Sequence, residues 1–179
     1  MMRAALNDLD HLAACVHGRR SRMAEAERLD ALTRSRGFAE FAPAVFPELE
    51  LATATAFQRH AVQTLIRELS GLRAALDGAG GCLLEWLLVR FHVENLKVLL
   101  RAVMAKLPFE QVRMHLVELP GTLALDAAAL AGVDSPRALL ESLLRESPFR
   151  HALDRTLAAE SDAPRPFFCE AALDRTYLV

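Results

Sequence analysis

The histidines and cysteines could bind a metal ion or act as nucleophiles, but their spacing favours neither chemistry. The six histidines form no HExxH pair and no i,i+4 pair with a carboxylate, the arrangement that presents two ligands to one metal ion. The three cysteines, Cys15, Cys82 and Cys169, lie far apart without a CxxC pair. Only a tertiary arrangement with a histidine would activate one of them, and single cysteines are more often small buried hydrophobic residues. We therefore predict no metal ligand, cofactor or catalytic residue.

The segment Gly78–Gly81 is the next candidate, because glycine-rich loops can cradle phosphate groups. It lacks the Lys-Ser/Thr pair of a phosphate loop and follows no strand pattern. The GxSxG motif of a nucleophile elbow is also missing from the sequence. A turn between two helices explains the glycines, since glycine readily ends a helix.

The segment HVENLKVLLRA, residues 92–102, combines an apolar helical stripe with the polar residues Asn95, Lys97 and Arg101. Polar residues on such a helix either face a catalytic cleft or fix helix contacts. Glu94, Lys97 and Arg101 follow at i, i+3 and i+7, so they can line one side of a helix as surface ion pairs that aid solubility. No nucleophile, base or ligand accompanies the polar residues, and we interpret them as contacts within a scaffold.

The densest basic segment is HGRRSR, residues 17–22. A solvated helix face, a nucleic-acid or nuclear-targeting patch, and a face for an acidic partner are all compatible with it. The chain has 21 basic and 23 acidic side chains and a formal net charge of −2, without the basic excess of a dedicated nucleic-acid binder. We therefore set nucleic acid aside.

Helices must position all of these residues. The chain has 179 residues, of which 53% are hydrophobic and only 6% aromatic, so Leu and Ala, both good helix formers, dominate. Strand-like alternation is rare, and we predict an all-α fold. The first helices are expected over 5–36, with a possible break at Gly18, over 38–42, ending at Pro43, and from about residue 48.

Two long apolar seams follow. The first recurs at steps of three and four residues and consists of Val62, Leu65, Leu69, Leu72 and Leu76. The second recurs in the same way and consists of Cys82, Trp86, Val89, Val93, Leu96, Leu100, Val103 and Leu107, before Pro108. With a glycine-rich turn at 77–81 between them, they predict a long antiparallel helical hairpin. Apolar residues off the second seam indicate that its helix packs on more than one side.

The predicted helices are shorter after Pro108. They cover 126–131, Pro136 to about 146 with Ser135 as N-cap, HALDRTLAAES after a break at Pro148, and a last helix that starts with FFCEAALDRTYLV. A weak internal repeat relates 29–46 to 130–149. We expect a first repeat over 1–108 and, over 109–179, a short-helix segment with the start of a truncated second repeat, in one structural unit.

The cysteine pattern and the termini bear on the cellular setting. Widely separated cysteines fit a reducing, cytosolic environment better than a disulfide framework. The first 16 residues carry Asp8 and Asp10 where a signal peptide needs an apolar core. The most apolar stretch, CLLEWLLVRF, is interrupted by Glu85 and Arg90 and is too short to span a bilayer. We expect a soluble chain that can still act on a membrane protein.

HVENLKVLLRA resembles the signature Asp-x-x-Asn-Leu/Ile-Lys-x-x-Leu-Arg of the V-type ATPase C subunit family, whose members are also called d subunits. The matching residues are Asn95, Leu96, Lys97, Leu100 and Arg101, whereas His92 stands where the family usually has Asp. CEAALDRTYL, residues 169–178, resembles the family's Glu-x-x-Leu-Asp-Arg-x-Tyr. There the matching residues are Glu170, Leu173, Asp174, Arg175 and Tyr177.

Three other segments are similar to the family in the same order. ACVHGRRSRMAEAERLDAL looks like the first helix with its Ala-Arg-x-Arg run, which Arg20 and Arg22 fit loosely. GFAEFAPAVFP looks like the short helix that the family closes with Thr-x-Tyr, here with Phe46 as the aromatic residue. LPGTLAL resembles the loop after the long hairpin. Family members are longer, so the chain would be a short homologue, a split gene product or a fragment.

The resemblance implies an all-α, funnel-like subunit with pseudo-threefold symmetry. Such a subunit is non-catalytic, needs no cofactor, and couples the central shaft of a V-type ATPase to the membrane rotor ring in ATP-linked ion transport. Its partners would be the shaft subunits and the ring, and it would be cytoplasmic and peripheral to the membrane. Its interaction or structural residues would be Arg20, Arg22, Asn95, Lys97, Arg101, Glu170, Asp174, Arg175 and Tyr177. If the chain is truncated, apolar surface near the last helix should be exposed and self-association is expected.

Two alternatives stay open at this point. An unrelated helical adaptor that binds a partner helix or peptide would be favoured by a regular superhelix of equal helix pairs. A small helical enzyme or metal protein would need an ordered cluster of histidines with cysteines or carboxylates.

Overall fold

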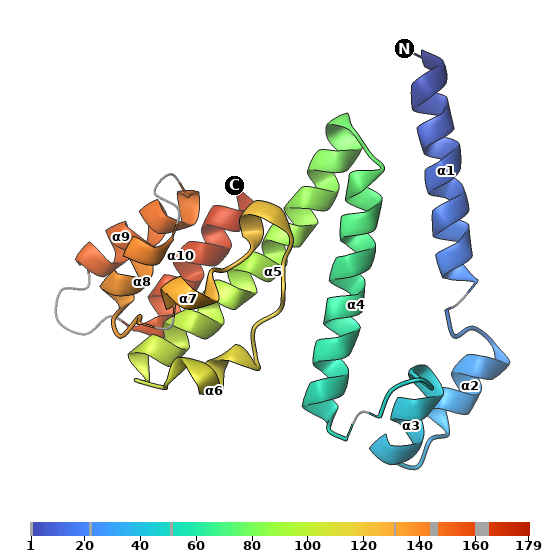
Figure 1. The fold of residues 1–179 in the computed structure, drawn as a ribbon, viewed down its shortest axis with the longest axis horizontal. Helices are drawn as coiled ribbons and strands as arrows, with labels where there is room; N and C mark the ends of the chain where they lie inside the picture. The colour runs from blue at the N-terminus through green and yellow to red at the C-terminus, as the bar shows by residue number, and fades with distance from the viewer. Residues whose placement is uncertain (1, 22, 51, 131, 144–146, 160–164) are drawn as a thin grey trace. The chain divides into compact units, whose positions relative to one another are not determined.

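The computed structural model describes residues 2–21, 23–50, 52–130, 132–143, 147–159 and 165–179, and every regular element in these ranges is a helix (Figure 1). The all-α prediction is confirmed. The chain divides into two compact units, Met1–Leu84 and Glu85–Val179, and the boundary falls inside α5 (Gly78–Met104). The division into repeats at residue 108 and the funnel arrangement stay predictions.

The first unit contains α1 (Met2–Arg20), α2 (Glu27–Thr33), α3 (Phe38–Val45), α4 (Ala54–Ala74) and the start of α5. The expected break at Gly18 is wrong, because α1 continues through it to Arg20. A single glycine lowers helix propensity without ending a helix. The expected end at Pro43 is also wrong. Pro43 lies inside α3, near the end of an eight-residue helix where a missing N–H removes only one helical hydrogen bond.

α4 begins later than predicted because a threonine caps it. The side chain of Thr53 accepts a hydrogen bond from the backbone N–H of Ala56 at 3.1 Å, which fixes the first residue at Ala54. Aromatic rings then join α3 to this end of α4. The ring centroids of Phe38, Phe41 and Phe46 lie 5.9, 5.4 and 5.2 Å from that of Phe57.

The connection between α4 and α5 is shorter than predicted. The glycine cluster expected to form the turn instead starts α5, beginning with Gly78 at a φ of 63°. Gly81 is buried, and a Cβ atom on it would lie 2.6 Å from the carbonyl oxygen of Leu76. Arg73 donates a hydrogen bond to the same oxygen at 3.1 Å. The chain therefore needs glycine at position 81 because the backbone approaches it closely.

We expect Gly81→Ala to lower the free energy of unfolding by about 1–3 kcal/mol, since no side-chain rotation relieves a clash with backbone. Gly80 provides the matched control. Its Cβ atom would meet the Leu76 side chain at 3.5 Å, an ordinary contact, so Gly80→Ala should stabilise the chain by about 0.5–1 kcal/mol. Urea denaturation measures both effects, and equal effects would contradict the close approach at Gly81.

The second unit contains the rest of α5, α6 (Phe109–Arg113), the 3₁₀ turn η1 (Gly121–Leu123), α7 (Ala127–Leu130), α8 (Pro136–Ser142), α9 (Pro148–Ala159) and α10 (Pro166–Leu178). The predicted cap of α8 is confirmed, because the Ser135 hydroxyl accepts a hydrogen bond from the N–H of Ala138 at 3.1 Å. The predicted end near residue 146 is wrong for the described part, where α8 ends at Ser142; residues 144–146 lie outside it. Pro148 opens α9 instead of breaking a helix, because the first helical position uses no N–H.

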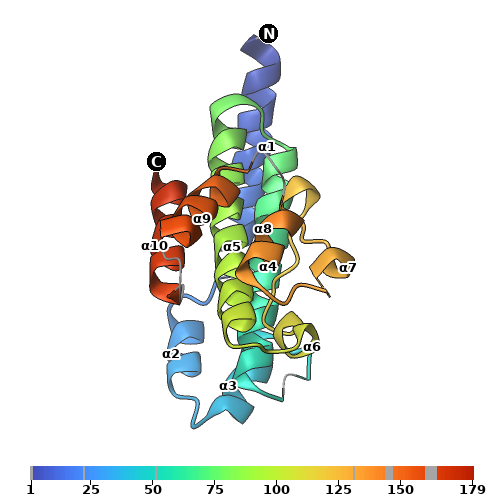
Figure 2. The same cartoon turned by 90° about the vertical axis from the view of Figure 1, so that its left-hand side faces the viewer.

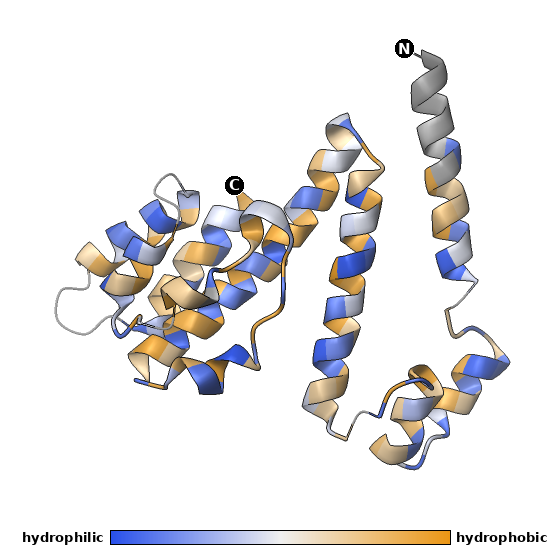
Figure 3. Cartoon of the chain, in the orientation of Figure 1, coloured by the Kyte–Doolittle hydropathy of each residue, from blue (hydrophilic) through white to orange (hydrophobic). Residues whose placement is uncertain are grey.

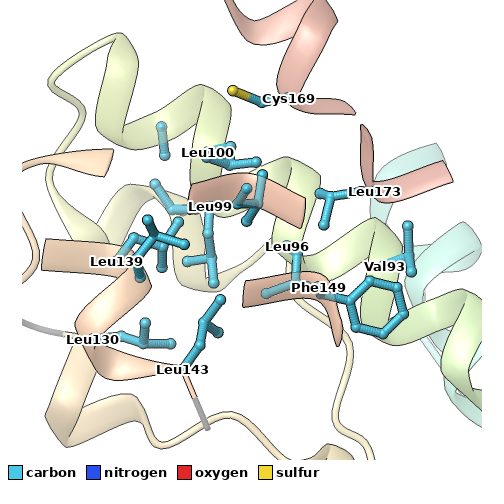
Figure 4. Packing of buried hydrophobic residues seen from close by; sticks show 14 of the residues in the cluster. Val93, Leu96, Leu99, Leu100, Leu130, Leu139, Leu143, Phe149, Cys169 and Leu173 are labelled. Carbon is cyan, nitrogen blue, oxygen red and sulfur yellow. The ribbon is translucent and has the colours of Figure 1, made fainter. Parts of the chain in front are cut away.

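α5 is the central element of the core of the second unit. Val93, Leu96 and Leu100 are fully buried and Leu99 is nearly so, which confirms that this helix packs on more than one side. Buried side chains from the later segments surround them, among them Leu130, Leu139, Leu143, Phe149, Cys169 and Leu173 (Figure 4). The ends of the predicted seam differ from its centre, since Trp86 and Leu107 are exposed. α9 and α10 lie side by side over this core (Figures 1 and 2).

Candidate functional site

α5 and α10 bring together two segments that are far apart in the sequence, HVENLKVLLRA and CEAALDRTYL. Charged side chains that are 69, 77 and 84 positions apart in the sequence bridge the two helices. We call this group the ion-pair ladder. It consists of Arg90, Glu94, Lys97 and Arg101 on α5 and Glu170 and Asp174 on α10.

Lys97 is the buried cation of the ion-pair ladder, with only 6% of its surface exposed. Its Nζ atom donates hydrogen bonds to Oδ1 of Asp174 at 2.6 Å and to Oε1 of Glu94 at 3.2 Å. The interpretation of Glu94, Lys97 and Arg101 as a purely surface series therefore fails at Lys97. A buried ammonium needs such partners, because burial of an unpaired charge is strongly unfavourable.

Arg90 closes a ring of four charges with Lys97 and the two carboxylates. It lies 2.6 Å from Glu94 and 2.9 Å from Asp174, measured from its guanidinium nitrogens to the carboxylate oxygens. Each carboxylate is thus shared by two cations, and the ring has no net charge. The motifs did not single out Arg90, although its i,i+4 spacing to Glu94 was a signal for it.

The ring fixes the ionisation of Asp174. The hydrogen bond from Lys97 lowers the pKa of this carboxyl below its ordinary value; burial opposes the shift, and Arg90 adds to it. Asp174 therefore stays ionised at neutral pH and holds both cations in place.

Arg101 and Glu170 form the outer rung of the ion-pair ladder. Their contact is bidentate, with Nε and Nη2 each donating to one carboxylate oxygen at 2.6 Å. The hydrogen bonds that Arg101 donates to Glu170 raise the pKa of its guanidinium, so Arg101 stays charged. The Arg101 side chain is 57% exposed, and solvent limits such a pair to about 0–1 kcal/mol. The geometry of this pair therefore serves to orient α10 and adds little to its stability.

Aromatic rings continue the contact between α5 and α10 beyond the ion-pair ladder. Tyr177 is buried and stacks on Trp86 with the ring centroids 4.6 Å apart and the planes inclined by 12°. Nε1 of Trp86 also donates a hydrogen bond to the backbone carbonyl of Tyr177 at 3.3 Å. Burial raises the pKa of the Tyr177 hydroxyl, opposed by Arg90, so the ring stays neutral at physiological pH. Trp86 was assigned only to the apolar seam by its spacing.

Asn95 anchors a loop rather than α10. Only 2% of its surface is exposed, and its amide makes two hydrogen bonds with the backbone of Val117. Nδ2 donates to the Val117 carbonyl at 2.8 Å, and Oδ1 accepts from the Val117 N–H at 2.9 Å. One side chain therefore satisfies both polar groups of a loop residue that has no helical partners.

His92, which stands at the position of the family's Asp, holds the next part of the same loop. Its Nδ1 donates a hydrogen bond to the carbonyl of Leu123 at 3.1 Å, and its ring lies 6.0 Å from that of Phe149. Burial lowers the pKa of His92, and the hydrogen bond with Leu123 opposes this shift. The imidazole is therefore neutral at pH 7, and its hydrogen bond with Leu123 is a structural contact.

We expect the stability of the second unit to fall when the pH drops below about 6.5, the ordinary pKa of histidine. The folded state binds the His92 proton at a lower pH than the unfolded state, so acidification through this window favours unfolding. Urea denaturation from pH 8 to pH 5 measures the effect. In His92→Asn this part of the pH dependence should be lost, and an unchanged profile in that variant would contradict the assignment.

The remaining matched residues lie apart from the ion-pair ladder. Arg20 is exposed and lies 3.6 Å from Glu25 in the first unit. Arg22 lies outside the described residues. Arg175 is exposed and points away from Glu170 and Asp174, into a groove between α9 and α10. The structure thus unites Lys97, Arg101, Glu170, Asp174 and Tyr177 at one helix contact and leaves Arg20 and Arg175 outside it.

The described histidine, cysteine, aspartate and glutamate side chains include no group of three that could hold a metal ion. In the same part of the chain, no helix is both long enough and apolar enough to cross a membrane. The geometry of the ion-pair ladder is that of a fixed contact between two helices.

A family model described as ATP synthase (C/AC39) subunit matches residues 12–179, and therefore both segments that form the ion-pair ladder. The chain belongs to this family. Members of the C/AC39 family are subunits of V-type ATPases, and the resemblance found in the sequence is confirmed. No match was found among curated proteins or among solved structures. In this C/AC39 family member the matched motifs meet each other across α5 and α10.

Proposed function

We propose that this C/AC39 family member is a non-catalytic rotor subunit that couples the central shaft of a V-type ATPase to its membrane ring during ATP-linked ion transport. The ion-pair ladder carries the proposal. A coupling subunit must transmit torque without changing shape. Lys97 and Arg101 in the matched segment of α5, together with the preceding Arg90, each pair with a carboxylate of α10 and so tie the two helices together.

The contact suits this mechanical role because three kinds of interaction resist different movements. The buried leucines of α5 and the buried Leu173 of α10 oppose separation of the helices. The bidentate pair of Arg101 and Glu170 opposes rotation, because two parallel hydrogen bonds fix the orientation of both side chains. The stack of Trp86 on Tyr177 fixes the far end.

The matched residues then divide into two roles. Internal contacts are made by Asn95, Lys97, Arg101, Glu170, Asp174 and Tyr177. Arg20 is exposed and available to the shaft subunits or the ring, whereas Arg175 is exposed at a groove of its own. The role of Arg22, which lies outside the described residues, stays a prediction. The working position of the subunit is cytoplasmic and peripheral, held to the membrane through the ATPase complex. Membership of the family supports these partners and this location.

The test is reconstitution of the ATPase complex with and without the chain. We expect the chain to co-purify with the central-shaft subunits. Without it, the catalytic head should still hydrolyse ATP, while ATP-driven ion uptake into vesicles should be lost and then restored by the wild-type chain. A chain that binds neither shaft nor ring, or whose removal leaves uptake intact, would contradict the proposal.

A more specific experiment replaces both residues of the outer rung, because their loss leaves the buried ring of charges in place. In Arg101→Ala/Glu170→Ala we expect assembly to persist and the number of ions moved per ATP to fall. Arg137→Ala/Glu141→Ala is the matched control, since both residues are exposed and lie outside the ion-pair ladder. If both double variants move the same number of ions per ATP, the outer rung has no mechanical role.

A further inference from the structure

A groove runs between α9 and α10, with a cavity volume of about 1340 Å³. Its α10 wall is a helical stripe that begins at Phe168 and ends at Val179, and its α9 wall is a matching stripe from Pro148 to Ala159. Glu170 and Asp174, which contact α5, are not part of the α10 stripe. The helix therefore has two working faces, one for the ion-pair ladder and one for the groove. Both colours of Figure 3 appear on α9 and α10, as expected of such helices.

The lining of the groove suits the apolar face of a helix. Four alanines, Ala152, Ala159, Ala171 and Ala172, line it and allow a third backbone to approach. Its two threonines bond to their own helices, Thr156 to the carbonyl of Ala152 at 2.9 Å and Thr176 to that of Ala172 at 2.8 Å. An extended peptide would find few hydrogen-bond partners for its backbone there, whereas a helix satisfies its own backbone.

The charged side chains that line the groove are of one sign. Arg155 projects from α9 and Arg175 from α10, both are exposed, and neither has an ion pair within the described part of the chain. None of the described residues that line the groove is acidic. The acidic Asp154 of α9 instead lines a separate pocket with Arg137 and Arg150. This contrasts with the other face of α10, where every carboxylate of the ion-pair ladder has a cation.

We propose that this groove is the docking site of an acidic amphipathic helix from a partner protein. The apolar face of that helix packs on the alanines, and its flanking carboxylates pair with Arg155 and Arg175. Charge complementarity selects the partner and steers its approach. The docking surface stands apart from the coupling role proposed above, because it needs neither the ion-pair ladder nor a rotating complex.

The experiment measures binding of a labelled helical peptide to the whole purified chain by fluorescence anisotropy. The probe is a peptide of about 18 residues with Leu and Ala along one face and Glu on both flanks. A peptide with Lys in place of each Glu, and a scrambled peptide of the same composition, are the ligand controls. We expect only the acidic amphipathic peptide to bind, with an affinity that falls as salt is added.

Two double variants locate the site. Arg155→Glu/Arg175→Glu should weaken binding by about tenfold or more, since both rim charges then repel the peptide. Arg113→Glu/Arg137→Glu makes the same charge change on exposed helix positions outside the groove and should bind as the wild type does. Thermal unfolding of both variants shows that they are folded, because the replaced side chains are exposed.

Three outcomes would overturn the proposal. The first is equal binding of the acidic and basic peptides. The second is equal binding by the two double variants. The third is dimerisation of the wild-type chain that Ala171→Glu abolishes and the acidic peptide does not compete with, since the occupant would then be a second copy. None of these measurements uses the ATPase, so failure here and failure of the coupling role are distinguishable.

Discussion

Replacing Asn95 with alanine should lower the free energy of unfolding by about 2–4 kcal/mol, because the N–H and the carbonyl of Val117 both lose their partner. The amide is 2% exposed, so water cannot easily take its place. Urea denaturation gives the size of the effect. Gln111→Ala, at an exposed position of α6, is the matched control and should change stability by less than about 0.5 kcal/mol.

Asn95→Asp tests whether both hydrogen bonds contribute. At neutral pH the carboxylate still accepts from the Val117 N–H but repels the Val117 carbonyl, to which Asn95 donates. At acidic pH the protonated carboxyl can donate again. We therefore expect the stability difference between wild type and Asn95→Asp to narrow as the pH falls. A stability difference that is constant with pH would show that the hydrogen bond donated by Asn95 does not contribute to stability.

Asp174→Asn should destabilise the chain more than Lys97→Met, although Lys97 is the more buried of the two. Loss of the carboxylate leaves the Lys97 ammonium with Glu94 as its remaining partner among the described residues, at a cost of about 1–3 kcal/mol. This lies below the range for fully buried pairs because the Asp174 side chain is 41% exposed. Methionine instead removes the buried charge and keeps the packing, while Arg90 still pairs with both carboxylates. If Lys97→Met lowered the free energy of unfolding more than Asp174→Asn does, this account would be wrong.

The pair of Lys97 and Asp174 also predicts that the stability of the chain depends on pH in the acid range. The folded state holds the pKa of Asp174 below its ordinary value of 3.8, so the unfolded state binds the proton first as the pH falls. The stabilisation is complete above pH 3.8 and is lost as the pH falls through the lowered pKa. Asp174→Asn should lack this part of the acid transition. Chemical denaturation between pH 6 and pH 2 compares the two chains.

The sequence alone was enough to predict the all-α fold and the family, because aliphatic periodicity and the two motifs are local patterns. It could not place the helix ends that depend on one contact. Thr53 fixes the start of α4 by its hydroxyl, and position 81 in the first turns of α5 needs glycine because the Leu76 carbonyl comes close to it. In both cases the deciding atom belongs to a neighbouring residue whose position follows only from the folded backbone.

The candidate site shows the same limit. The matched residues Lys97 and Asp174 were identified separately, but their contact spans 77 positions and no spacing rule reaches that far. Arg90 and Trp86 were missed as members of the site because their contacts with Asp174 and Tyr177 arise only when α10 packs on α5. Arg175 was grouped with Asp174 by motif, yet one residue along an α-helix turns a side chain by about 100°, and Arg175 lies on the face of α10 that lines the groove.

The positions of two rungs of the ion-pair ladder, Lys97 with Asp174 and Arg101 with Glu170, have a further consequence. Lys97 meets Asp174 and Arg101 meets Glu170, so a step of four residues up α5 corresponds to a step of four down α10. The helices run antiparallel, and a slip of one turn, about 5.4 Å, would break both the contact of the buried Lys97 with Asp174 and the bidentate pair of Arg101 and Glu170. The six side chains thus favour one axial register, so anything bound to α10 has a defined height along α5.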